Sequence, residues 1–196
     1  MKSERPTVLI VPGLRDESPD HWQTILGLWL ASDGYKVENV APIGKNNNSC
    51  IQRVDGLDEA IRRIAGPTVL VAHSGGCITV AHWAARRADT RHVVAALLAV
   101  PPDFETPMPA GYPSKEVLQA HAWLPVPKRA LPFPSTVVAS TNDPLASVDA
   151  VTELAAQWGS KVQHLGAVGH LNPASGFGPW PLGHNLVVGL LQGFGD

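Results

Sequence analysis

A serine flanked by small residues, Ser74, has the clearest potential for chemistry in this chain. It lies in the segment AHSGG (residues 72–76), between an apolar run and an alanine-rich amphipathic stretch. A serine in a tight strand-to-helix turn is typical of a G-x-S-x-G nucleophile elbow, where the two backbones nearly touch. Ala72 departs from that pattern by one methyl group. The flanking strand and helix patterns favour a nucleophile over a serine that merely caps a helix.

Two further residues stand where the partners of such a serine are expected. A serine hydroxyl becomes a good nucleophile when an imidazole removes its proton and a carboxylate orients that imidazole. With this elbow, the acid and then the histidine follow the serine along the chain. Asp143 follows the apolar run Thr136–Ser140, and His170 lies in a glycine-flanked loop after Lys161–Leu165. The sequence therefore predicts a catalytic triad of Ser74, Asp143 and His170.

Other acids and histidines were weighed for the same roles. Asp103 is the alternative acid, because it follows the preceding strand, whereas Asp149 is expected to favour a helix N-terminus. His73 should point away from Ser74, since neighbouring residues on an extended segment face opposite sides. The remaining histidines precede the acid or lie in expected regular structure: His21, His82, His92, His121, His164 and His184.

Acyl transfer also needs donors for the negative charge that develops on the substrate oxygen. In this arrangement one donor is the N–H that follows the nucleophile, here Gly75, and the other comes from the loop after the first strand. That loop reads VPGLR (residues 11–15), and Leu14 follows its glycine. We expect Gly75 and Leu14 to form the oxyanion hole, although a Pro-Gly pair alone signals no more than a turn.

No residue pattern predicts a metal or a cofactor. Cys50 and Cys77 are the only cysteines, which gives neither a disulfide framework nor a zinc spacing. Cys77 falls on the inward stripe of an expected helix, where a buried thiol is usual.

The elements that must position these residues alternate along the chain, as in a parallel sheet covered on both faces. The expected strands are rich in Val and Leu with little alternation, as buried strands should be. They are Thr7–Val11, Lys36–Val40, Thr68–Ala72, Val94–Val100, Thr136–Ser140 and Lys161–Leu165. The sequence predicts an α/β-hydrolase fold with a mostly parallel six-stranded sheet.

Apolar stripes with helical spacing fall between the strands, and the first helix is expected to begin at the Ser18-Pro19 pair. The five stripes are Trp22, Ile25, Leu26 and Trp29; Val54, Leu57, Ile61 and Ile64; Cys77, Val80, Ala81, Ala84 and Ala88; Val148, Val151, Ala155 and Trp158; and Leu182, Leu186 and Leu190. The segment Pro101–Pro134 holds nine of the 18 prolines and is expected to form a structured loop or a short lid.

Composition narrows the class of protein. A chain of 196 residues that is 44% hydrophobic and 16% charged is expected to fold as one globular domain, residues 1–196. Its net charge of −2 is too balanced to favour nucleic acid or a membrane surface as partner. The apolar runs are far shorter than the roughly 20 residues of a membrane span. The polar Met1–Pro6 and the short run after it do not form a signal peptide, so we expect the cytoplasm.

With these residues in place, the chain resembles the retinoblastoma-binding-protein-nine-like family of small serine hydrolases. The matching segments, in order, are PG (12–13), DHWQ (20–23), AHSGG (72–76), NDP (142–144), GHLN (169–172) and SGFGPWPLG (175–183). The resemblance implies a compact α/β-hydrolase without a large cap domain. It also implies Ser74, Asp143 and His170 as the triad, and activity on small esters or related acyl compounds.

The resulting hypothesis is a serine hydrolase that cleaves small carboxylic esters or related acyl compounds through an acyl-enzyme intermediate. The alternative is a non-catalytic binding or regulatory protein on a hydrolase scaffold, for which the six tryptophans would offer aromatic surface.

Overall fold

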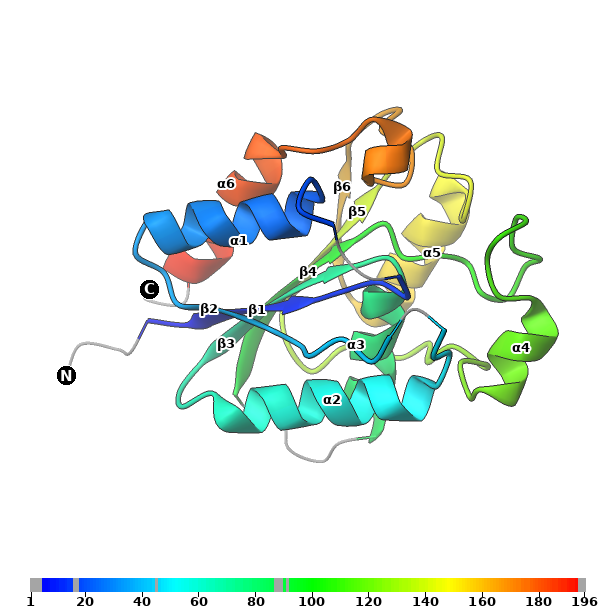
Figure 1. The fold of residues 1–196 in the computed structure, drawn as a ribbon, viewed down its shortest axis with the longest axis horizontal. Helices are drawn as coiled ribbons and strands as arrows, with labels where there is room; N and C mark the ends of the chain where they lie inside the picture. The colour runs from blue at the N-terminus through cyan, green and yellow to red at the C-terminus, as the bar shows by residue number, and fades with distance from the viewer. Residues whose placement is uncertain (1–4, 16–17, 45, 87–89, 91, 194–196) are drawn as a thin grey trace.

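Six parallel strands form one open sheet in the order β2-β1-β3-β4-β5-β6 (Figure 1). The computed structural model describes residues 5–15, 18–44, 46–86, 90 and 92–193. The strands are β1 (Thr7–Val11), β2 (Val37–Asn39), β3 (Thr68–His73), β4 (Val93–Ala99), β5 (Ser135–Ala139) and β6 (Lys161–His164). Every neighbouring pair is parallel, which confirms the predicted sheet.

The helices cover both faces of the sheet (Figure 1). They are α1 (Trp22–Ser32), α2 (Cys50–Arg63), α3 (Gly75–Arg86), α4 (Lys115–Ala120), α5 (Val148–Trp158) and α6 (Pro181–Gln192), with a 3₁₀ turn η1 (Pro173–Ser175). Helices α1 and α6 pack on one face, and α2, α3 and α5 pack on the other, so two apolar layers enclose the four central strands. The edge strands β2 and β6 are partly buried or exposed, so the prediction of buried strands was wrong for these two. None of the helices in the described ranges is long and apolar enough to span a bilayer.

The carboxyl ends of two central strands are fixed by a sharp change of backbone direction. Ser74, directly after β3, has a φ of 53°, and Val100, directly after β4, has a φ of 47°. A left-handed residue cannot continue an extended strand, so both strands end there. The observed strand ends differ from the predicted ones by no more than one residue.

Helix α1 begins later than the sequence pattern predicts. The Ser18-Pro19 pair forms a turn instead, in which the backbone oxygen of Ser18 accepts from the N–H of His21. The Nδ1 atom of His21 accepts from the N–H of Gln23 at 3.2 Å and caps the helix. The prediction of a Ser18 cap was therefore wrong, because the turn and a histidine cap satisfy these backbone groups.

The apolar stripe predicted for α6 was wrong at Leu182, whereas Leu186 and Leu190 are partly buried against the core. The buried residues of α6 are Gly183, Val187 and Leu191, and Leu182 is 42% exposed. The Trp180 ring lies against Gly183, where an added Cβ would come within 2.1 Å of it. This contact turns the glycine side of the helix inward. Of the other stripes, the Ala88 prediction lies outside the described residues.

The proline-rich segment 101–134 is tied to the core, as a structured loop should be. Phe104, Leu118 and Trp123 are fully buried, and the Trp123 indole N–H donates to the backbone oxygen of Asn48. The short helix α4 is the only helix in this segment, all of which is described, and the described chain contains no large cap domain.

Candidate active site

Ser74 occupies the turn between β3 and α3 with a left-handed backbone. Its N–H donates to the Ala99 oxygen of β4 at 2.9 Å, which holds the turn against the sheet. A Cβ added to Gly76 would lie 2.6 Å from the backbone oxygens of both Val11 and Pro12. The turn therefore requires glycine at this position.

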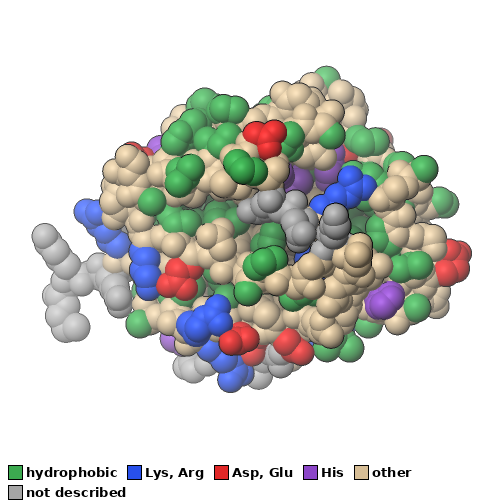
Figure 2. Space-filling view, in the orientation of Figure 1, with side chains coloured by type: hydrophobic (Ala, Val, Ile, Leu, Met, Phe, Trp, Pro, Cys, Tyr) green, Lys and Arg blue, Asp and Glu red, His purple; other side chains and the backbone are tan. Residues whose placement is uncertain are grey.

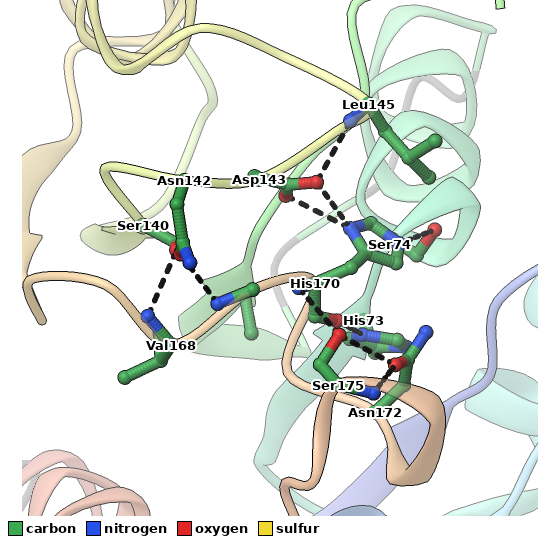
Figure 3. Close-up of polar contacts among 12 residues, drawn as sticks. His73, Ser74, Ser140, Asn142, Asp143, Leu145, Val168, His170, Asn172 and Ser175 are labelled. Carbon is green, nitrogen blue, oxygen red and sulfur yellow. Dashed lines mark hydrogen bonds and ion pairs between the residues drawn. The ribbon is translucent and has the colours of Figure 1, made fainter. Parts of the chain in front are cut away.

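The structure brings the three predicted side chains together at the carboxyl edge of the sheet (Figure 3). The Nε2 atom of His170 lies 2.8 Å from the Ser74 Oγ. On the other side of the ring, Nδ1 lies 2.8 and 3.0 Å from the two carboxylate oxygens of Asp143. These distances form a continuous relay of hydrogen bonds from hydroxyl to imidazole to carboxylate.

The partners of His170 favour the tautomer that carries its proton on Nδ1. The side chains of His170 and Asp143 are only 4% and 1% exposed. A carboxylate accepts only, so the Nδ1–H of a neutral His170 donates to Asp143. Its Nε2 lone pair is then free to accept the Ser74 proton, and the buried carboxylate favours the imidazolium that results.

The loops that carry the acid and the histidine are tied to each other. Asn142 Oδ1 accepts from the N–H of Gly169 at 2.6 Å and from the hydroxyl of Ser140 at 3.0 Å. The Ser140 oxygen in turn accepts from the N–H of Val168 at 3.3 Å (Figure 3). This network sets the distance between the two catalytic candidates, and sequence reasoning assigned no role to Ser140 or Asn142.

A second set of contacts supports the histidine backbone. The N–H of His170 donates to the Ser175 hydroxyl oxygen at 3.0 Å, and that hydroxyl donates to Asn172. The His170 backbone oxygen accepts from the Nε2–H of His73 at 3.0 Å. His73 therefore bonds to the backbone of His170 and not to Ser74. Asn172 and Ser175 lie in the GHLN and SGFGPWPLG segments of the family resemblance, but the sequence assigned neither of them a role.

Burial favours the neutral form of two histidines that line the cleft beside Ser74. Desolvation lowers the pKa of His73 well below its usual value, and the nearby His170 and His21 lower it further. Burial likewise lowers the pKa of His21 to about 4. The ring centres of His21 and His73 lie 4.8 Å apart, and the rings meet edge to face. These neutral rings add no positive charge that would compete for Asp143.

The two predicted oxyanion donors lie side by side. A Cβ added to Gly75 would lie 3.5 Å from the Leu14 backbone nitrogen and 2.7 Å from the Leu14 Cγ. Neither the Gly75 N–H nor the Leu14 N–H donates to an acceptor within the described ranges. Two such donors next to Ser74 are suited to a developing oxyanion.

A cleft of about 220 Å³ opens onto Ser74 and His170. Figure 2 shows a hollow in which histidine atoms lie beside a cationic side chain. Apolar groups from the proline-rich segment and the acid loop form part of the wall: Pro102, Phe104, Met108, Tyr112 and Leu145. The guanidinium of Arg15 lies 4.3 Å from the Tyr112 ring centre and donates to the Gly111 oxygen, which joins the β1 loop to this wall.

The remaining candidates lie elsewhere. Asp103 accepts from the N–H of Glu105 and makes no bond to His170. Asp149 lies in the first turn of α5, as expected. Cys77 is fully buried, its Sγ–H donates to the Ala99 oxygen, and burial raises the pKa of its thiol well above the usual value.

Comparisons with known proteins identify the family and the fold of the chain. A family model described as serine hydrolase matches residues 8–188. A protein described as a YdeN-like hydrolase from Pectobacterium atrosepticum has a TM-score of 0.78 at 22% identity, over 96% of this chain and 91% of that chain. The ydeN gene product of B. subtilis has a TM-score of 0.77 at 18% identity, over 95% and 99%.

Esterase 2 of Thermogutta terrifontis also has this architecture, with a TM-score of 0.69 at 16% identity, over 99% of this chain and 84% of that chain. Among curated protein sequences, none matches the chain. At these identities the structural likeness establishes the fold, which is that of an α/β-hydrolase.

Proposed function

The chain belongs to the serine hydrolase family, and on that premise we propose that it cleaves small carboxylic esters or related acyl compounds. The observation that carries the proposal is the relay in which Nε2 of His170 lies 2.8 Å from the Ser74 oxygen and Nδ1 lies 2.8 Å from the Asp143 carboxylate. This arrangement supplies a nucleophile, a base and an orienting acid in one buried cluster.

In the proposed reaction, the Ser74 oxygen attacks the substrate carbonyl carbon as its proton moves to Nε2 of His170. The carbonyl oxygen becomes an oxyanion that accepts from the N–H groups of Leu14 and Gly75. The tetrahedral intermediate then expels the alcohol, which takes the proton from Nε2. An acyl group remains bonded to Ser74.

Water completes the cycle by the same steps. His170 removes a proton from a water molecule as the water oxygen attacks the acyl carbon, and it then returns that proton to the Ser74 oxygen. The carboxylic acid leaves and the serine is restored. Asp143 keeps the imidazole in one tautomer and stabilises its charged form during both halves.

The cleft supports a small apolar acyl group as substrate. Phe104, Met108 and Leu145 form an apolar part of its lining, and its volume of about 220 Å³ suits a short acyl chain. We expect p-nitrophenyl acetate and butyrate to be hydrolysed faster than the laurate ester. A rate that rises steadily to laurate would contradict this substrate class.

We also propose that the chain is similar in detail to the retinoblastoma-binding-protein-nine-like hydrolases. Two of the motifs behind that resemblance have structural roles here. Gln23 of the DHWQ segment donates to the backbone oxygens of Val11 and Val71, and so joins α1 to two strands. Asn172 of the GHLN segment holds Ser175, which in turn holds His170.

The decisive experiment is replacement of the proposed nucleophile. Ser74→Ala should lose essentially all ester hydrolysis, about 10³-fold or more, while melting near the wild-type temperature. A fluorophosphonate probe should label the wild-type protein on Ser74 and leave the variant unlabelled. Hydrolysis by Ser74→Ala within a few-fold of wild type would overturn the proposal.

The same labelling separates the alternative role. A non-catalytic binding protein on this scaffold would not react with the probe, because phosphonylation needs an activated serine. Alkylation of the native protein with iodoacetamide should leave hydrolysis unchanged, since the Cys77 thiol is fully buried.

A further inference from the structure

The side chain of Arg53, on helix α2, holds the loop that follows β1. Its Nη1–H donates to the backbone oxygen of Gly13 at 3.0 Å, and its Nη2–H donates to that of Leu14 at 3.0 Å. Nη2 also donates to the Asn47 oxygen at 3.4 Å. A planar guanidinium that bonds to successive carbonyl oxygens fixes the orientation of the peptide units as well as their position.

One of these peptide units carries the proposed oxyanion donor. The carbonyl of Gly13 and the N–H of Leu14 belong to the same peptide bond, and in a planar trans peptide these two groups point in opposite directions. Since the Gly13 oxygen points toward Arg53, the Leu14 N–H must point away from α2.

The elbow lies close to the same peptide. A Cβ added to Gly13 would lie 3.4 Å from the Ser74 Cβ, and one added to Gly75 would lie 3.5 Å from the Leu14 nitrogen. The loop thus bonds to the guanidinium through its carbonyl oxygens, and its Leu14 nitrogen lies beside the nucleophile turn.

From this geometry we propose that Arg53 is a positioning residue for the oxyanion hole, which orients the Leu14 N–H toward the substrate oxygen. The inference rests on the proposed function. Arg53 acts through the backbone and does not line the cleft that contains Ser74. Its charge also polarises the Gly13 carbonyl, which strengthens the N–H of the same peptide as a donor.

The contacts of Arg53 would meet a requirement of oxyanion stabilisation. Oxyanion donors lower the barrier only when they are oriented in advance, so that no reorganisation is needed as charge develops. The donor loop contains Gly13, whose backbone is intrinsically permissive. A bond to the carbonyl restricts rotation of the peptide without placing a side chain in the cleft.

The test compares Arg53→Met with Arg63→Met, a matched change on the same helix. Arg63 is exposed and pairs with Glu59. Fluorophosphonate titration first counts the competent sites, and kcat is then expressed per titrated site. Arg53→Met should lower this kcat about tenfold to a hundredfold with KM within about threefold, because it weakens one oxyanion donor. Arg63→Met should match wild type.

A transition-state analogue provides a second measurement. A boronic acid forms a tetrahedral adduct with the serine and places an oxygen in the oxyanion hole. Its inhibition constant should rise in Arg53→Met by the same factor as kcat/KM falls. In Arg53→Ala, millimolar guanidinium should restore part of the lost kcat, and it should leave Arg63→Ala unchanged.

Two results would overturn the inference. One is a kcat per titrated site within twofold of wild type in Arg53→Met, and the other is a loss of activity that only follows a loss of titratable sites. If Arg53→Met does not fold, Arg53→Lys takes its place, with an intermediate kcat expected because an ammonium lacks the planar fork. Wild-type kcat in Arg53→Lys then overturns the inference. If the Ser74→Ala variant hydrolysed esters within a few-fold of the wild-type rate, that result would instead contradict the proposed function itself.

Discussion

At the scale of single residues, the site depends on which atom of each ring and carboxylate faces which partner. Asp143 uses one oxygen for two contacts, since its Oδ1 accepts from the Leu145 N–H at 2.9 Å and lies 3.0 Å from Nδ1 of His170. Its Oδ2 lies 2.8 Å from the same ring nitrogen. The carboxylate is thus held by its own loop, and it presents both oxygens to the imidazole.

This geometry predicts the effect of Asp143→Asn. The amide oxygen keeps the bond to Leu145, and the amide NH₂ then faces Nδ1 of His170, which must become an acceptor. The ring proton moves to Nε2, so the imidazole can no longer accept the Ser74 proton. We expect kcat to fall by about 10³ to 10⁴-fold with little change in melting temperature.

Asp103→Asn is the matched control for that variant. Asp103 makes the same local contact, from its Oδ1 to the N–H two residues later, but it makes no bond to His170. Its hydrolysis rate should stay within a few-fold of wild type. If Asp103→Asn were the more damaging of the two, Asp103 would be the acid instead.

At the scale of elements, the site requires α3 to lie directly against the end of β1. Gly76 is where the two backbones meet, and an added Cβ would lie 2.6 Å from two backbone oxygens. Backbone atoms cannot move aside as a flexible side chain can. A shift of α3 would therefore also displace the oxyanion loop and the contacts that Arg53 makes with it.

Gly76→Ala should disturb both stability and catalysis. The methyl group forces α3 away from the β1 loop, with a cost of about 1 to 3 kcal/mol for overpacking, and the two oxyanion donors move apart. The urea concentration at the midpoint of unfolding should decrease, and so should kcat. Gly189→Ala on α6 is the control, because its added Cβ would meet no described atom within 4 Å apart from the adjoining backbone of its own helix. This change should raise stability by about 0.5 to 1 kcal/mol.

The sequence predicts much of this arrangement because local patterns carry it. Ser74 and Asp143 each follow a buried strand, and His170 follows the edge strand β6, whose residues are exposed or partly buried. Parallel strands bring such positions to one edge of the sheet. The contacts between loops are not local. Ser140 bonds to Val168 only because β5 and β6 pair in one register, and no spacing rule predicts that pairing.

Arg53 is a second residue whose contacts cannot be predicted from local sequence patterns. It precedes the buried Val54 of the α2 stripe, and nothing near it in the sequence connects it with the loop 40 residues earlier. The start of α1 was mispredicted for a similar reason, because a histidine cap has no strong sequence signature. Side chains that bond to distant backbone are visible only in the structure.

At the scale of the whole molecule, burial favours the neutral form of three histidines. Burial lowers the pKa of His21 to about 4, and it lowers the pKa values of His73 and His82 as well. Two of them donate from Nε2, His73 to the His170 oxygen and His82 to the Trp123 oxygen. They connect the elbow and the proline-rich segment to the core.

These shifts predict that the fold loses stability in mild acid. A group whose folded pKa is depressed binds protons more readily when unfolded, so stability is complete above the unfolded value of 6.5 and falls as the pH drops toward the folded value, which is about 4 for His21. The melting temperature should therefore fall between pH 7.5 and pH 5, where ordinary carboxyl groups, with pKa values of about 4, contribute little. His21→Asn keeps an acceptor for the Gln23 N–H and removes one titrating ring, so its melting temperature should fall less over the same range. An equal fall in both proteins would show that His21 is not one of the groups that link stability to pH.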